Sequence, residues 1–115
     1  MRVKSGVWVG AYLRRVAAEG MFAVVAKKGA EEAGAIFVKV NRLDGTAELY
    51  GPAPQTAFDE GEADDRRWRA IVPTPGAPES EVDGRLERER RFDGDLWIVE
   101  IDSREGRHLL DPVVE

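Results

Sequence analysis

Two adjacent arginines and a lysine–asparagine pair are the side chains of this sequence with the clearest chemical potential. Arg14 and Arg15 lie near the end of a mostly apolar stretch, and Lys39 and Asn41 lie two residues apart in a run of β-branched residues. Guanidinium, ammonium and amide groups donate the hydrogen bonds by which proteins bind carboxylates and phosphates. These four residues are therefore predicted to bind a small anionic ligand. The competing interpretation is structural, with the arginines complementing a helix dipole and pairing with Glu19.

His108 is the only histidine of the chain, and Asp111 follows it closely in GRHLLD. An imidazole beside a carboxylate can act as a general base. The sequence offers no serine or second ligand to partner it, so we interpret His108 as a surface or capping residue, and no catalytic residue is assigned. The chain also lacks the glycine-rich motifs that hold phosphates and the G-x-S-x-G motif of serine hydrolases.

Carboxylates gather between Asp59 and Asp65, and oxygen ligands of this kind bind Ca²⁺ or Mg²⁺. Their spacing does not fit the D-x-D-x-D-G pattern of a calcium loop, which favours a solvated acidic loop. Zinc is excluded in practice because the chain has one histidine and no cysteine. We predict no metal and no cofactor.

Composition limits the classes of protein to which this chain of 115 residues can belong. Apolar residues make up 43% and charged residues 34%, as in one soluble globular domain over residues 1–115. A net charge of −5 argues against nonspecific nucleic-acid binding, which depends on Lys and Arg neutralising phosphates. No run approaches the roughly 18 apolar residues of a membrane span. The apolar run after Lys4 lacks a cleavage pattern and is assigned to the fold, and the absence of cysteine is compatible with a reducing cytoplasm.

The periodicity of apolar residues predicts elements in the order α-β-β-β-β-α-β. The expected ranges are a helix over 5–19 capped by Ser5, strands over 21–28, 35–43, 46–50 and 68–72, a helix over 80–92, and a strand over 96–102. The last strand is apolar on both faces, which predicts an internal position in the sheet. We expect a two-layer α+β domain with a mostly antiparallel sheet of about five strands, the first three forming a meander.

A hairpin over residues 34–51 is the central element of this expected sheet. Asp44 and Gly45 favour a two-residue type I′ turn, which pairs Val40 with Leu49. Because side chains alternate along a strand, this register assigns every residue to one face. The two faces are then a core face with Ile36, Val38, Val40, Ala47 and Leu49, and an amphipathic working face with Phe37, Lys39, Asn41, Glu48 and Tyr50.

The first helix is apolar almost all round, with a core stripe at Val9, Tyr12, Leu13 and Val16 and further apolar residues opposite. A helix of this kind is usually covered on more than one side, which favours a second subunit. The predicted interaction surface combines its outer side with aromatic residues of the sheet: Val7, Ala11, Phe37, Tyr50 and Trp97. If the three aromatic residues were exposed together, they would form a platform on which RNA bases stack.

Three blocks of the sequence resemble one family. They are WVGAYLRR (8–15), GAIFVKVNRLDG (34–45) and FDGDLWIVEIDSREGRHLLD (92–111). Together they resemble a family of short bacterial proteins, seen mostly in alphaproteobacteria and known as domain of unknown function 1491. The resemblance covers nearly the whole chain, and it implies neither an activity nor any site residue.

Three hypotheses of function follow. The first is a small cytoplasmic protein-interaction or accessory domain without catalytic activity, acting as a homodimer or with another protein. The second is a domain or enzyme that binds a small anionic ligand through its basic residues. The third is RNA binding on the sheet face, which the net charge disfavours. A concave pocket with convergent basic groups would support the second hypothesis.

Overall fold

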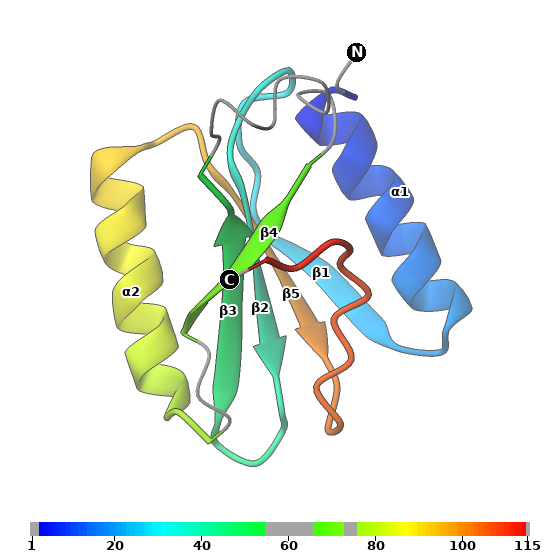
Figure 1. Ribbon diagram of the computed structural model, residues 1–115, viewed down its shortest axis with the longest axis vertical. Coiled ribbons are helices and arrows are strands. Elements are labelled where there is room, and N and C mark those ends of the chain that lie inside the picture. The colour runs from blue at the N-terminus through cyan, green and yellow to red at the C-terminus, as the bar shows by residue number, and fades with distance from the viewer. Residues whose placement is uncertain (1–2, 55–65, 73–75, 115) are drawn as a thin grey trace.

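The computed structural model describes residues 3–54, 66–72 and 76–114. These residues form two helices and five strands (Figure 1). In chain order they are α1 (Ser5–Ala18), β1 (Phe22–Lys27), β2 (Ile36–Asn41), β3 (Ala47–Pro52), β4 (Trp68–Val72), α2 (Glu79–Phe92) and β5 (Trp97–Asp102). The predicted element order and the α+β class are confirmed. No helix within the described ranges is long and apolar enough to cross a membrane.

The five strands form one mixed sheet in the order β1-β5-β2-β3-β4. β5 is antiparallel to β1 and parallel to β2, and the β2–β3 and β3–β4 pairs are antiparallel. The internal position predicted for the last strand is confirmed, whereas the predicted meander of the first three strands is wrong. β5 lies between β1 and β2 because a strand that is apolar on both faces gains most where both faces are covered.

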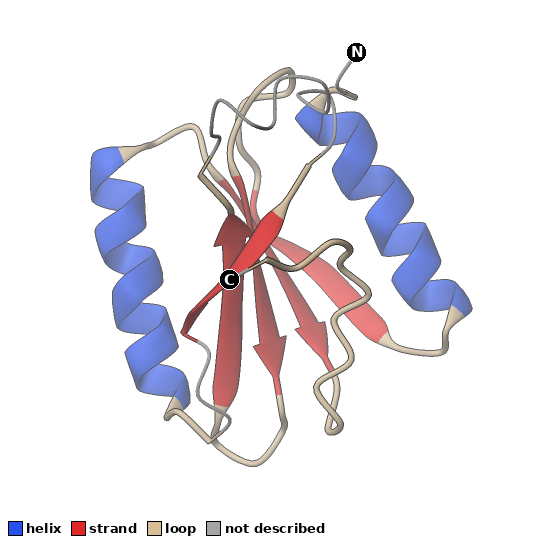
Figure 2. Cartoon of the chain, viewed as in Figure 1, coloured by secondary structure: helices blue, strands red, loops and turns tan. Residues whose placement is uncertain are grey.

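The two helices cover opposite faces of the sheet (Figure 2). α1 packs through Val9, Tyr12 and Val16 on the core that β2 and β5 form on one face. α2 packs through Val82 and Leu86 on the core of the other face. Helix, sheet and helix therefore make three layers, where the sequence predicted two. The reason is that β2 and β5 carry apolar side chains on both faces, and each face needs its own cover.

The β2–β3 hairpin forms as predicted, but its register differs by one residue. The Arg42 amide donates to the Thr46 carbonyl at 3.0 Å, which leaves a three-residue loop in which Leu43 and Gly45 have φ angles of 64° and 88°. Val40 therefore pairs with Glu48.

A shift of one residue moves every side chain of the shifted strand to the opposite face. Ala47 and Leu49 thus pack on the α2 side, whereas Tyr50 packs against the α1 core. The predicted core face and working face are each correct for β2 and wrong for β3.

The start of α1 is anchored to the loop before β2. Ser5 is the first residue of the helix and not its cap, and Lys4 occupies the N-cap position. The buried Ser5 hydroxyl donates to the Gly34 carbonyl at 2.6 Å. This bond fixes the angle at which α1 crosses the sheet, and with it the wall of the cavity described next.

Candidate functional site

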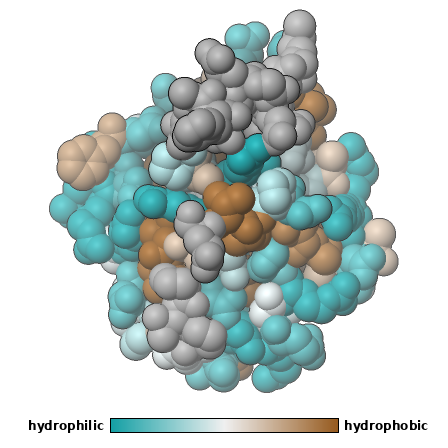
Figure 3. Space-filling view, in the orientation of Figure 1, coloured by the Kyte–Doolittle hydropathy of each residue, from teal (hydrophilic) through white to brown (hydrophobic). Residues whose placement is uncertain are grey.

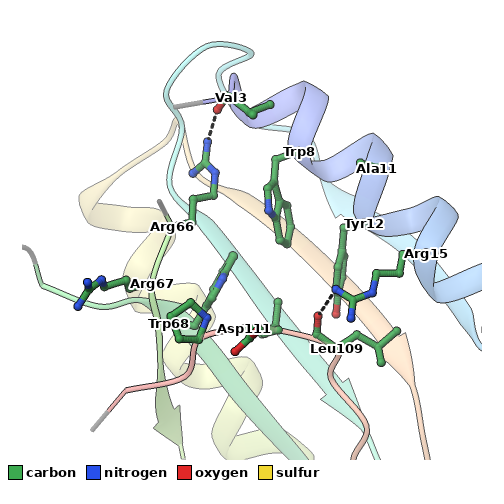
Figure 4. Close-up of a pocket in the computed structure, with 12 residues that line it drawn as sticks. Val3, Trp8, Ala11, Tyr12, Arg15, Arg66, Arg67, Trp68, Leu109 and Asp111 are labelled. Carbon is green, nitrogen blue, oxygen red and sulfur yellow. Dashed lines mark hydrogen bonds between the residues drawn. The ribbon is translucent and has the colours of Figure 1, made fainter. Parts of the chain in front are cut away.

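A cavity of about 490 Å³ opens between α1, the start of β4 and the segment that follows β5. This volume lies within the range of about 300–1,000 Å³ that is typical of small-molecule sites. Figure 4 shows the side chains that line it: Val3, Trp8, Ala11, Tyr12, Arg15, Arg66, Arg67, Trp68, Leu109, Leu110, Asp111 and Pro112. The surface around it is mostly hydrophilic, and Figure 3 shows apolar residues near the centre of that face, over β4 and the C-terminal segment.

α1 supplies one wall of the cavity through a single side of the helix. Trp8, Ala11, Tyr12 and Arg15 follow one another at spacings of three and four residues, which brings them onto one face. This face lies next to the buried core stripe. The aromatic rings are therefore held against the core, while the Arg15 head group reaches solvent.

Three aromatic rings form a continuous surface in the cavity. Trp8 stacks on Tyr12 with ring centroids 4.8 Å apart and an interplanar angle of 17°, and Trp8 meets Trp68 of β4 at 5.0 Å and 40°. Aromatic pairs at such separations each contribute about 0.5–1.5 kcal/mol beyond the area they bury. The surface is thus preorganised for a flat apolar group.

The C-terminal segment is attached to α1 by two hydrogen bonds. The Tyr12 hydroxyl donates to the His108 carbonyl at 2.6 Å, and Arg15 Nη1 donates to the Leu109 carbonyl at 3.2 Å. Burial raises the pKa of Tyr12 far above neutrality, although the charge of Arg15 opposes part of this effect. The hydroxyl therefore stays protonated and remains a donor.

The same segment is attached to the edge of the sheet. The Trp68 amide donates to the Pro112 carbonyl at 3.0 Å, and the Val114 amide donates to the Trp68 carbonyl at 2.7 Å. These bonds make an isolated parallel bridge beside β4. The segment thereby closes the side of the cavity that faces β4.

His108 holds the backbone of this segment in shape. Its Nδ1 accepts a hydrogen bond from the Leu110 amide at 2.9 Å, and its ring lies 4.6 Å from the ring of Tyr50. Burial lowers the pKa of His108, and the charge of Glu48 opposes this effect. The ring is therefore neutral at pH 7, with Nδ1 as acceptor, which is the capping role interpreted from the sequence.

The charged groups of the cavity are mainly cationic. Arg15, Arg66 and Arg67 line it together with one carboxylate, Asp111. Arg66 Nη2 donates to the Val3 carbonyl at 2.8 Å, which orients its guanidinium beside α1. The balance of these lining charges is positive, the opposite of the net charge of −5 of the chain.

A family model described as "Protein of unknown function (DUF1491)" matches residues 3–111. The chain belongs to the DUF1491 family. The resemblance inferred from the three sequence blocks is thereby confirmed.

Solved structures of DUF1491 relatives carry the same fold. The solution structure of a protein from A. tumefaciens is 50% identical, covers 90% of this chain and 87% of its own, and has a TM-score of 0.76. The crystal structure of a DUF1491 family protein from Caulobacter crescentus CB15 is 39% identical, with full coverage of both chains and a TM-score of 0.79. An NMR structure of a DUF1491 family protein from the same organism has the same identity and TM-score. No curated protein matches the chain.

The four residues predicted to bind an anion are divided between the two sides of this DUF1491 sheet. Arg14 and Arg15 are exposed on α1, and Arg15 lines the cavity. Lys39 and Asn41 lie on the α2 side, facing the opposite layer. The structure therefore does not bring the four side chains together.

On the α2 side, Lys39 is surrounded by carboxylates. Its Nζ lies 2.7 Å from Glu79 Oε2, 2.8 Å from Asp83 Oδ1 and 3.7 Å from Glu100 Oε1. Asn41 Nδ2 donates to Glu79 and Glu100. Burial opposes the charged form of Lys39, but the hydrogen bonds to Asp83 and Glu79 and the charge of Glu100 outweigh it and raise the pKa. This ammonium is used within the protein.

The five residues of the predicted interaction surface do not form one surface either. Val7 is 54% exposed and Ala11 is exposed on α1. Phe37 is buried under α2, Trp97 is buried on the α1 side, and Tyr50 is half-buried against the ring of His108. An exposed aromatic platform on the sheet is therefore not formed.

Sequence reasoning missed most of the cavity. The spacing of Trp8, Tyr12 and Arg15 on one helix was visible in the sequence, but it was interpreted as core and boundary. Trp68 and Asp111 are brought to the same place only by the pairing of the C-terminal segment with β4, which has no local signal. The predicted acidic loop, Asp59 to Asp65, lies outside the described residues. Among the described residues, no group of three acidic or histidine side chains is arranged to hold a metal ion.

Proposed function

We propose that this protein binds a small anionic molecule with a flat apolar body in the cavity beside α1, as a cytoplasmic accessory domain that carries out no chemistry on it. The observation that carries the proposal is the combination of three aromatic rings, Trp8, Tyr12 and Trp68, with guanidinium groups at the cavity. Aromatic surfaces supply contact area at low entropic cost, and guanidinium groups bind carboxylates and phosphates in a fixed geometry.

The lining supports binding rather than catalysis. Tyr12 uses its hydroxyl to hold the His108 carbonyl, and Asp111 is the one carboxylate of the lining. The described lining contains no serine, cysteine, lysine or histidine side chain that would act as a nucleophile or general base. The cavity thus offers shape and charge.

The test uses two dyes of similar shape, anilinonaphthalene sulfonate and its uncharged analogue phenylnaphthylamine, measured by isothermal titration calorimetry. We expect the sulfonate to bind about tenfold more tightly, which corresponds to about 1.4 kcal/mol. Arg15→Gln should remove most of that difference and leave the affinity for the neutral dye unchanged. Arg14→Gln is the matched control, since Arg14 is its exposed neighbour on the same helix and does not line the cavity.

Equal affinity for the two dyes would contradict the proposal, as would equal effects of the two arginine variants. Native mass spectrometry of protein purified gently from its own host gives an independent result. The proposal expects a small added mass, and the natural ligand is then identified from that mass.

A second candidate function is a homodimer that uses the outer side of α1, because Val7 is 54% exposed there beside the exposed Ala11. Glutamate at both positions should dissociate such a dimer in analytical ultracentrifugation. An unchanged sedimentation profile would remove this interface.

A further inference from the structure

The α2-side face of β1 carries two exposed apolar side chains that the described chain does not cover. Phe22 is 63% exposed and Val24 is 43% exposed. Their neighbours Ala23 and Val25 point to the α1 core, so alternation places Phe22 and Val24 on the opposite face. α2 packs over β3, on the far side of the sheet from β1.

Carboxylates lie directly beside these apolar residues. In the β1–β5 register, Phe22 is opposite Asp102 and Val24 is opposite Glu100. Both acidic residues are partly exposed. The row continues to α2, where Glu79 and Asp83 are also partly exposed.

The cations near this row are already engaged. Lys39, with a side chain only 6% exposed, lies among Glu79, Asp83 and Glu100. Lys27, at the end of β1, directs its Nζ to the carbonyls of Lys28, Gly94 and Leu96. The accessible charge on this face is therefore negative.

We propose that the β1–β5 face, defined by Phe22, Val24, Glu100 and Asp102, is a docking surface for a partner-protein segment that carries Lys or Arg next to large apolar side chains. Apolar side chains of the partner cover Phe22 and Val24, and its cations meet the carboxylates. Charge complementarity selects this occupant. The same charges repel nucleic acid and anionic lipid surfaces, and this surface is separate from the cavity beside α1.

The test is an NMR titration of ¹⁵N-labelled full-length protein with a synthetic seven-residue peptide of alternating lysine and leucine. A peptide of alternating glutamate and leucine is the control probe. We expect saturable shifts confined to the amides of β1 and β5 and their neighbours with the lysine peptide, and no saturable shifts with the glutamate peptide.

Two pairs of variants separate docking from general attraction to an acidic protein. Phe22→Ala should weaken binding about tenfold, whereas Phe92→Ala should not, although Phe92 on α2 is 91% exposed. Glu100→Gln with Asp102→Asn should weaken binding about tenfold and reduce its salt dependence, whereas Glu81→Gln with Glu87→Gln on the exposed side of α2 should not.

Three results would overturn the proposal. The first is no saturable binding of the lysine peptide. The second is binding that the paired variants reduce equally, which is nonspecific attraction. The third is a concentration-dependent dimer that Phe22→Ala dissociates, which would assign this face to a second copy of the chain.

Discussion

Lys39 on the α2 side of the sheet and Arg15 on the α1 side are both basic residues that the sequence assigned to one anion site. Lys39 lies within 4 Å of three carboxylates and its side chain is 6% exposed. Arg15 is exposed, and its hydrogen bond goes to the neutral carbonyl of Leu109. The cation that lies among carboxylates serves the fold, whereas the cation that meets a carbonyl at the rim of a cavity keeps its charge for a ligand.

Replacing Lys39 by methionine should break this comparison most strongly. The change keeps an unbranched side chain but leaves Glu79, Asp83 and Glu100 close together without a cation. We expect the free energy of unfolding to fall by about 2 kcal/mol, less than for a fully buried pair because Asp83 is half exposed. Urea denaturation measures it. Arg15→Met should cost no more than about 0.5 kcal/mol, and equal losses would show that both cations are structural.

The β2–β3 turn determines which side chains of β3 meet each layer, so its disruption affects both sides. Gly45 has a φ of 88°, which a β-branched residue adopts only with strain. Gly45→Val should lower stability by about 1–2 kcal/mol. Gly94→Val is the control, because Gly94 is an exposed turn residue without positive φ. No difference between the two variants would contradict the three-residue loop.

The Tyr12 hydroxyl tests how firmly the C-terminal segment holds the α1 side. Tyr12→Phe removes only the donor to the His108 carbonyl. We expect a loss of about 1 kcal/mol, typical of one hydrogen bond, and faster amide exchange at Val114, whose amide bonds to Trp68. Hydrogen exchange followed by NMR measures this. Unchanged exchange at Val114 would mean that β4 alone holds the segment.

His108 predicts a pH dependence that is specific to the α1 side. Burial lowers its pKa in the folded protein, so the unfolded chain, with a pKa of about 6.5, binds the proton more readily. The free energy of unfolding should therefore fall as the pH drops below about 6.5, until it passes the folded-state pKa. His108→Asn keeps an acceptor for the Leu110 amide without a titrating group. Its stability between pH 5.5 and 7.5 should change less than that of the unmodified protein, and parallel curves would exclude this role.

The parts of the fold that the sequence predicted are those with local causes. The stripe of Val9, Tyr12 and Val16 has helical spacing, and the two-sided apolar pattern of β5 required cover on both faces. The hairpin was predicted because Asp44 and Gly45 favour a turn, but the same residues fit a two-residue or a three-residue loop. Local preference does not distinguish these loops, and the register depends on the choice.

The parts that were not predicted depend on contacts between distant segments. The parallel pairing of β2 with β5 and the bridge between Trp68 and Val113 have no signal in either partner alone. The same holds for Lys39, whose carboxylates come from α2 and β5. The cavity was missed for this reason, since α1, β4 and the C-terminal segment each contribute only part of its lining.

The position of β5 between β1 and β2 has a consequence for synthesis on the ribosome. Residues 22–27 pair in the sheet with residues 97–102, so β1 has no neighbouring strand until β5 has emerged. The β2–β3 hairpin closes locally and can form earlier. At usual elongation rates the delay is on the order of seconds, and pairings so distant in sequence slow the folding search. During that interval β1 exposes both backbone edges, and its apolar side chains Ala23 and Val25 are open to chaperones.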